Sequence, residues 1–125
     1  MNAHLLDLPV LDPRHVRDLG EELDSHAGAR AFLRTYLEML PDRLSSVCHA
    51  VRGGDGDTAM DRALSLKVTS TMVGALQLAA LAESMEALLC GGDWAAAEPL
   101  LEVLAPAVAA VRTAGAAVVN GLLHQ

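Results

Sequence analysis

The stretch Asp61–Ala75 reads D-R-A-L-S-L-K-V-T-S-T-M-V-G-A and contains Lys67, the only lysine of the chain. Wound as a helix at about 100° per residue, this stretch and the turn before it have two faces. One face is small and apolar enough to enter a helical core: Ala59, Ala63, Leu66, Ser70 and Val73. The opposite face clusters around Leu64 and comprises Met60, Leu64, Lys67, Val68 and Thr71. An apolar patch with one cation beside it, turned away from the core, predicts a docking surface.

The composition favours a single all-α domain. At 125 residues the chain is long enough to bury a core of its own. Apolar residues make up 52% of the chain but aromatic residues only 2%, so Leu, Val, Ala and Met must form the core. These residues suit close-packed helices better than a sheet rich in aromatic and β-branched residues. The net charge of -7 argues against a nucleic-acid partner, because this surface would repel phosphates.

The sequence also predicts a cytoplasmic protein. The first residues, M-N-A-H-L-L-D-L-P, show no basic region followed by a long apolar run, so no signal peptide is expected. Two apolar stretches, residues 68–82 and 113–125, fall short of a membrane span and contain polar residues, so no membrane association is expected. Cys48 and Cys90 are isolated from each other and are interpreted as reduced core thiols.

Five helices are predicted by apolar spacing and by turn signals. Residues 1–11 form an irregular lead-in, and residues 12–125 form one helical domain. The expected helices span roughly residues 13–25, residues 27–52, a segment from a cap at Asp55 or Asp57 to Gly74, residues 75–90 and residues 94–123. Because the connections are short, neighbouring helices should be antiparallel. The predicted architecture is an up-and-down four-helix bundle with an additional N-terminal helix.

Prolines and glycines give more local expectations. Asp12 followed by Pro13 is a favourable helix start. Pro41 should kink the second helix, and two later prolines, Pro99 and Pro106, should kink the last helix or break its start. The sequence G-G-D occurs after both the second and the fourth helix, which indicates shared turn chemistry rather than a duplicated unit.

The helix order, together with L-S-L-K-V-T-S-T-M-V-G-A, resembles the histidine-containing phosphotransfer (HPt) domain of bacterial phosphorelays. That family carries a motif of the form A-H-x-L-K-G-S-x-x-x-x-G-A. Here Leu66-Lys67 matches its Leu-Lys, Thr69 and Ser70 match its small hydroxyl positions, and Gly74-Ala75 matches its Gly-Ala. The G-G-D-W turn of residues 91–94 is also similar to the family's Gly-Asp turn, and the resemblance covers roughly residues 11–119.

Two positions depart from the family motif. The phospho-accepting histidine should lie two residues before Leu66, where this chain has Leu64. The small glycine one turn later is Val68. A leucine has no nitrogen to carry a phosphoryl group, and Lys67 is left without its usual phosphohistidine neighbour. The resemblance therefore implies a degenerate HPt domain with no catalytic residue, no cofactor and no enzymatic activity.

Other chemistry has weaker support in the sequence. The five histidines, His4, His15, His26, His49 and His124, are scattered, and no spacing among them suits a metal. The carboxylate pairs Glu21/Glu22 and Glu83/Glu86 are interpreted as solvated helix faces. Met60, Met72 and Met85 are interpreted as core or rim residues rather than as a cofactor site.

Three functions stay open at this point. The first is an adaptor or regulator of two-component signalling that binds a receiver domain or a histidine kinase through the face around Leu64. The second is a true phosphotransfer protein that uses a non-motif histidine, His49 or His15. The third is a helical module that forms a homodimer through the same patch. In this last case, or if the N-terminal segment covers the patch, Leu64 would be buried.

Overall fold

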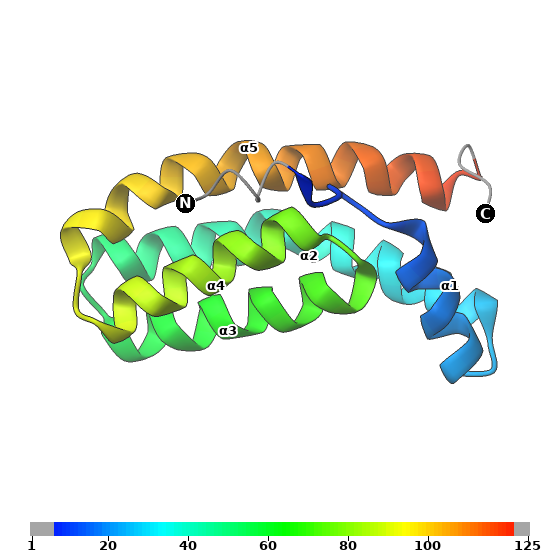
Figure 1. Cartoon of the computed structure of the whole chain (residues 1–125), viewed down its shortest axis with the longest axis horizontal. Coiled ribbons are helices and arrows are strands. Elements are labelled where there is room, and N and C mark those ends of the chain that lie inside the picture. Colours follow the sequence, from blue (N-terminus) through cyan, green and yellow to red (C-terminus); the bar gives the residue numbers. More distant parts are fainter. Residues whose placement is uncertain (1–6, 122–125) are drawn as a thin grey trace.

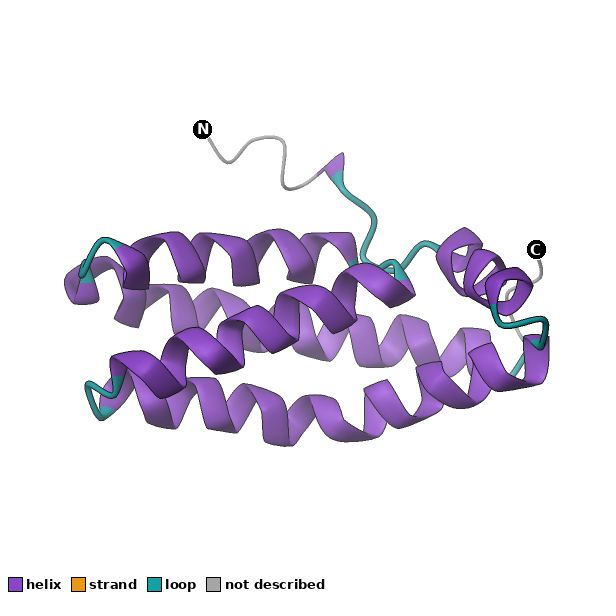
Figure 2. Ribbon diagram, turned by 90° about the horizontal axis from the view of Figure 1, so that it is seen from below, coloured by secondary structure: helices purple, strands orange, loops and turns teal. Residues whose placement is uncertain are grey.

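A computed structural model describes residues 7–121, which form five helices and no strand. The helices are α1 (Pro13–Glu22), α2 (His26–Arg52), α3 (Gly56–Val73), α4 (Leu76–Cys90) and α5 (Trp94–Val119). Helices α2 to α5 lie side by side as an antiparallel bundle, and the short α1 lies at one end of it (Figures 1 and 2). The predicted all-α fold is confirmed.

The core lies between the four long helices. Helix α3 packs against α4 and α2, while α5 packs against α2 and α4. The largest fully buried side chains are Leu33, Leu40, Leu66, Leu78, Met85, Leu101 and Leu104. All five residues predicted for the inner face of α3 are buried. Since α2 and α4 flank α3, its outer face is the part that remains open.

A buried hydrogen bond joins α2 to α3. The hydroxyls of Tyr36 and Ser70 lie 2.7 Å apart, and both residues are buried. Burial raises the pKa of Tyr36 to about 12, which keeps the phenol neutral. The only fully buried polar side chain among the described residues of α3 is therefore satisfied.

Both G-G-D segments form the same turn. Gly54 and Gly92 adopt left-handed backbone conformations with φ of 70°. The N–H of the following aspartate reaches back to the last helical turn: Asp55 N–H donates to the Ala50 carbonyl at 3.0 Å, and Asp93 N–H to the Leu88 carbonyl at 2.8 Å. Each aspartate then caps the next helix with its side chain. The prediction of shared turn chemistry explains both connections, and of the two candidate caps for α3 it is Asp55 that serves.

Gly74 connects the α3–α4 turn to α1. It ends α3 with φ of 84°, and its carbonyl accepts the backbone N–H of Asp12 at 2.9 Å. Asp12 caps α1 and forms hydrogen bonds with the Arg14 guanidinium, which lowers the pKa of that carboxyl to about 2. The start of α1 is thus attached to the C-terminal end of α3.

Several local expectations were wrong. Helix α1 ends at Glu22 rather than Ser25, and Leu23 is its exposed C-cap. Cys90 is exposed and not a core thiol. Kinks or a broken start were expected in the last helix, and the broken start does not occur, because α5 is one continuous helix. Both of its prolines are exposed, and the carbonyls that they leave without an N–H partner belong to the exposed Ala95 and Glu102. The expectation for residues 122 and 123 lies outside the described residues.

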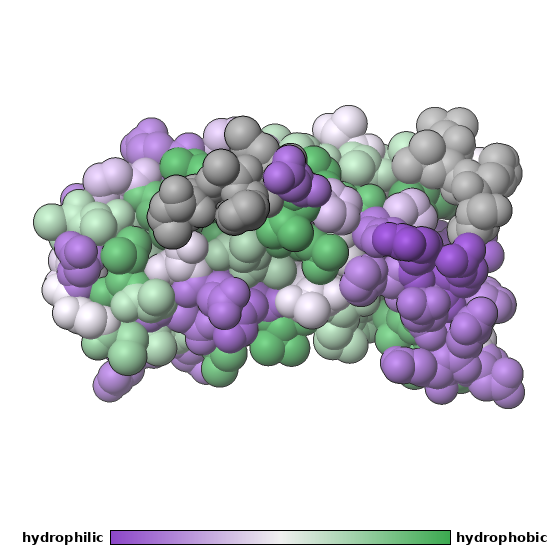
Figure 3. Space-filling model, in the orientation of Figure 1, coloured by the Kyte–Doolittle hydropathy of each residue, from purple (hydrophilic) through white to green (hydrophobic). Residues whose placement is uncertain are grey.

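By length and composition alone, α5 is apolar enough to cross a membrane. In the structure it packs on α2 and α4 and buries one stripe, which includes Leu101, Leu104, Val108 and Val111. Hydrophilic residues gather at the α1 end of the molecule, while hydrophobic residues reach the surface along the bundle (Figure 3).

The contact between Gly74 and α1 can be tested by Gly74→Ala. A Cβ at this position would lie 2.6 Å from the Asp12 carbonyl oxygen and 2.8 Å from the His15 Cβ. The left-handed backbone should cost about 1–2 kcal/mol and the overpacking about 1–3 kcal/mol more. The measurement is the free energy of unfolding in urea.

The matched control for Gly74→Ala is Gly92→Ala. Gly92 is also left-handed, but a Cβ there meets nothing within 4 Å. This variant should show only the backbone cost, about 1–2 kcal/mol. Equal destabilisation by the two substitutions would contradict the proposed packing of α1 on Gly74.

Candidate functional site: the outer face of helix α3

Leu64 and Val68 lie on the open face of α3, as the sequence predicted. Their side chains are 44% and 48% exposed, and Met72, one turn further, is 41% exposed. The three residues follow one another at intervals of four and so form a continuous strip on the helix. We call Leu64, Val68 and Met72 the apolar stripe. Of the three, Met72 was not predicted as a surface contact, although its spacing from Val68 indicates it.

The other three predicted residues border this stripe. Met60 is half-buried and packs against the core. Thr71 is exposed, and its hydroxyl donates to the Lys67 carbonyl of its own helix at 2.8 Å. Lys67 is half-buried on the α4 side. The structure therefore brings all five predicted residues to one face of α3, with Met60 and Lys67 less accessible than Leu64 and Val68.

Lys67 is paired with a carboxylate of α4. Its Nζ lies 2.7 Å from Glu86 Oε1, and the two side chains are 31% and 16% exposed. The hydrogen bond to Glu86 raises the pKa of Lys67, with a smaller Coulombic contribution from Glu83. The expectation that Glu86 is solvated was wrong, because the close packing of α3 on α4 covers it. The positive charge of Lys67 is neutralised within the protein.

Arg43 borders the stripe on the opposite side and was missed by the sequence analysis. It extends from α2, and its Nη1 donates to Ser65 Oγ at 2.9 Å and to Thr69 Oγ1 at 3.5 Å. No carboxylate within residues 7–121 forms a salt bridge with it. The sequence does indicate that Arg43 faces inward. Position 43 follows Leu40 by three residues and precedes Val47 by four, which is the spacing of core-facing positions in a helix.

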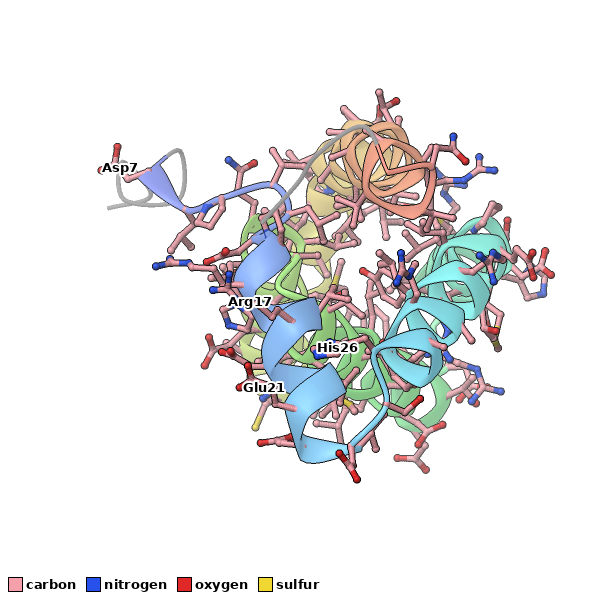
Figure 4. The ribbon with its side chains drawn as sticks, turned by 90° about the vertical axis from the view of Figure 1, so that its right-hand side faces the viewer. Asp7, Arg17, Glu21 and His26 are labelled. Atoms are coloured by element: carbon pink, nitrogen blue, oxygen red, sulfur yellow. The ribbon has the colours of Figure 1, made fainter. Side chains whose placement is uncertain are left out.

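None of the described histidines lies on α3, although His15 lines a hollow of ≈ 260 Å³ together with Thr71 and Met72 at the end of the apolar stripe. His15 is in the first turn of α1, with its Nδ1 3.7 Å from Asp12 Oδ2. His26 lies between α1 and the start of α2 (Figure 4), where a Cβ at Gly20 would meet its ring. His49 is exposed on α2, beside a hollow of ≈ 670 Å³ that Asp42, Ser45 and Ser46 also line. None of the residues of α3 is a histidine.

The chemistry available on this face is limited. The apolar stripe offers contact area but no nucleophile, and the nearby Ser65 and Thr69 hydroxyls bond to Arg43 and to backbone. Within residues 7–121, no group of three His, Cys, Asp or Glu side chains is arranged to hold a metal ion. The face is suited to binding another surface rather than to bond making.

The Lys67–Glu86 pair generates a prediction about stability. Lys67→Met should destabilise the protein, because it leaves the largely covered Glu86 carboxylate without its partner. Adding Glu86→Gln should recover part of the loss, since the amide costs less to bury than an unpaired charge. Urea unfolding of the wild type, both single variants and the double variant measures this coupling. Purely additive effects would mean that the two side chains do not interact in solution.

Comparison with known proteins agrees with this architecture. The sequence matches the family model of the Hpt domain over residues 31–114, which is most of the chain. The crystal structure of histidine-containing phosphotransfer protein B (HptB) from Pseudomonas aeruginosa PAO1 superimposes with a TM-score of 0.80 at 27% identity. That match covers 90% of this chain and 96% of HptB. No curated protein matches the sequence significantly. The chain belongs to the Hpt domain family, the histidine-containing phosphotransfer domains of phosphorelay signalling.

Proposed function

We propose that this chain is an HPt domain that does not accept phosphate and instead acts as an adaptor or regulator. In this role it docks a receiver domain or a histidine kinase through the outer face of α3. The observation that carries the proposal is the exposed Leu64, which stands where the family motif has its histidine, on a helix without any histidine.

The alignment of the motif rests on several neighbouring residues. Leu66-Lys67 and Gly74-Ala75 keep the family's spacing, and this spacing assigns the histidine position to Leu64. Leu66 is buried and Gly74 ends α3. Both positions agree with the alignment of this helix to the family motif. The family's small glycine corresponds to Val68, which is 48% exposed. In this chain a reactive side chain and a small neighbour are thus both replaced by apolar side chains.

The exposed stripe favours binding by the hydrophobic effect. Three exposed apolar side chains in one row are unusual on a solvated helix face and are typical of an interaction surface. Covering the remaining exposed part of each side chain is worth about 1 kcal/mol, because full burial of such a side chain is worth about 1.5–3 kcal/mol and less than half of each is exposed. The pairing of Lys67 with Glu86 fits the same role, because this lysine is not free to neutralise a phosphoryl group.

The proposal also includes location and cofactors. An HPt domain that binds receiver or kinase domains acts where those domains are, and we propose a cytoplasmic location. Docking through apolar contacts needs no cofactor. Whether the partner is activated or inhibited depends on which of its own surfaces is covered.

The absence of phosphate acceptance can be tested with phosphorylated receiver domains of the host. The wild-type chain should acquire no acid-labile, base-stable label, because position 64 offers no nitrogen. The variant Leu64→His/Val68→Gly restores the motif and is the positive control for the scaffold. Label on the wild type that is lost in His49→Gln or His15→Gln would overturn the proposal and support transfer through a non-motif histidine.

Docking can be tested by capturing the host's receiver and kinase domains on the immobilised chain. Leu64→Asp should reduce binding at least tenfold, because a charge would have to be buried at the centre of the contact. Val103→Asp is the matched control, since Val103 is 47% exposed on α5, which does not border the stripe.

Two outcomes of this capture experiment would contradict the docking role. Equal binding by the wild type and Leu64→Asp would show that the surface lies elsewhere. A wild-type homodimer that Leu64→Asp converts to monomer, with no receiver or kinase bound, would assign the stripe to self-association.

A further inference from the structure

We propose that Arg43 is the receiving site for an acidic side chain of the docked partner. The inference rests on the proposed docking function and adds to it the charge and the orientation of the partner. A partner protein would place an aspartate or glutamate carboxylate on the α2 side of the apolar stripe.

The hydrogen bonding of Arg43 is incomplete. A guanidinium carries five N–H donors and binds a carboxylate through two parallel hydrogen bonds. The contacts of Arg43 are all to neutral atoms: Ser65 Oγ, Thr69 Oγ1 and, at 3.9 Å, Met39 Sδ. Its Nε is buried and has no hydrogen-bond partner among the described residues. A half-buried cation without an anion is costly in a free protein, and a carboxylate would relieve that cost.

The two cations beside the stripe differ in whether a carboxylate neutralises them. Lys67, on the α4 side, is neutralised by Glu86 at 2.7 Å. Arg43, on the α2 side, has no salt bridge within residues 7–121. With a net charge of -7, the chain as a whole does not attract an acidic partner. Arg43 is therefore the local position at which a negative charge is favoured, and the α4 side disfavours one.

The Arg43 guanidinium borders an open space. Arg43 and Thr69 line a hollow of ≈ 120 Å³ together with Phe32, Thr35, Tyr36 and Met39. This volume exceeds that of a single water, about 30 Å³, and it admits a carboxylate group. The exposed Thr35 supplies a hydroxyl at the rim, and Met39 is 43% exposed. Thr69, which lines the hollow, directly follows Val68 of the apolar stripe, so one partner surface reaches both.

The test uses the receiver or kinase domain retained in the capture experiment. Its Kd is measured by isothermal titration calorimetry at low and at high salt for the wild type, Arg43→Met and Arg43→Lys. Arg43→Met, which keeps an apolar stem of similar length, should weaken binding about tenfold or more and remove most of the salt dependence. Arg43→Lys should recover only part of the affinity, because lysine lacks the two-donor geometry.

Arg112→Met is the matched control. Arg112 is an exposed arginine on α5, with no salt bridge among the described residues, so its removal changes the net charge equally. It should leave both the Kd and its salt dependence unchanged. Circular dichroism and thermal unfolding of each variant establish that the bundle is folded.

The outcomes separate this inference from the docking function. If Leu64→Asp abolishes binding but Arg43→Met changes neither the Kd nor its salt dependence, the docking function stands and the role of Arg43 is wrong. If no receiver or kinase domain binds, the docking function is wrong, and Arg43 is then tested with sodium acetate by nuclear magnetic resonance. Saturable shifts at Ser65, Thr69 and the Arg43 Nε–H that are missing with sodium chloride and in Arg43→Met would support the carboxylate site. Their absence would overturn it.

Discussion

The packing of α3 between α2 and α4 is the constraint on which the rest of the structure depends. The inner face of α3 carries two alanines, a serine, a leucine and a valine, and all are buried. Side chains this small let α3 approach its neighbours closely, and Leu66 and Val73 fill the remaining space. Once this face is buried, the helix geometry leaves Leu64, Val68 and Met72 outside. The exposure of the apolar stripe is therefore a consequence of the core.

The same packing determines the charges beside the stripe. Because α4 lies close to α3, Glu86 reaches Lys67, and both become partly covered. On the other side, α2 brings Arg43 against two hydroxyls of α3 but brings no carboxylate within residues 7–121. The resulting surface has an apolar centre, a neutralised cation on one side and an unpaired cation on the other. In the proposed docking role, such a surface would select a partner by shape and by the position of one negative charge, without a reactive group.

Most of the fold could be predicted from the sequence because its signals are local. The two faces of α3 follow from the helical period, and the Gly-Gly-Asp turns follow from the backbone freedom of Gly54 and Gly92. A broken start of the last helix was one of the two effects expected of Pro99 and Pro106, and it does not occur because of where the prolines lie. Both are exposed, so solvent can reach the backbone groups that they free.

The site was less predictable because its polar contacts join different helices. Lys67 and Glu86 are brought together by the packing of α3 on α4, which no local sequence pattern specifies. Arg43 lies at core-facing spacing in α2, which indicates an unusual arginine but not its contact with Ser65. The resemblance to the family motif indicated that position 64 is the place of the phospho-accepting histidine. The exposure of Leu64 is seen only in the structure.

The central claim is that the outer face of α3 docks a signalling partner through contact alone. Mapping of amide chemical shifts by nuclear magnetic resonance, during titration with an unphosphorylated receiver domain of the host, tests it most directly. The account predicts that the largest changes fall on residues 60–72 of α3 and on the neighbouring part of α2, around Arg43. Changes centred on α5 or on the α1 end, with the α3 residues unaffected, would contradict it.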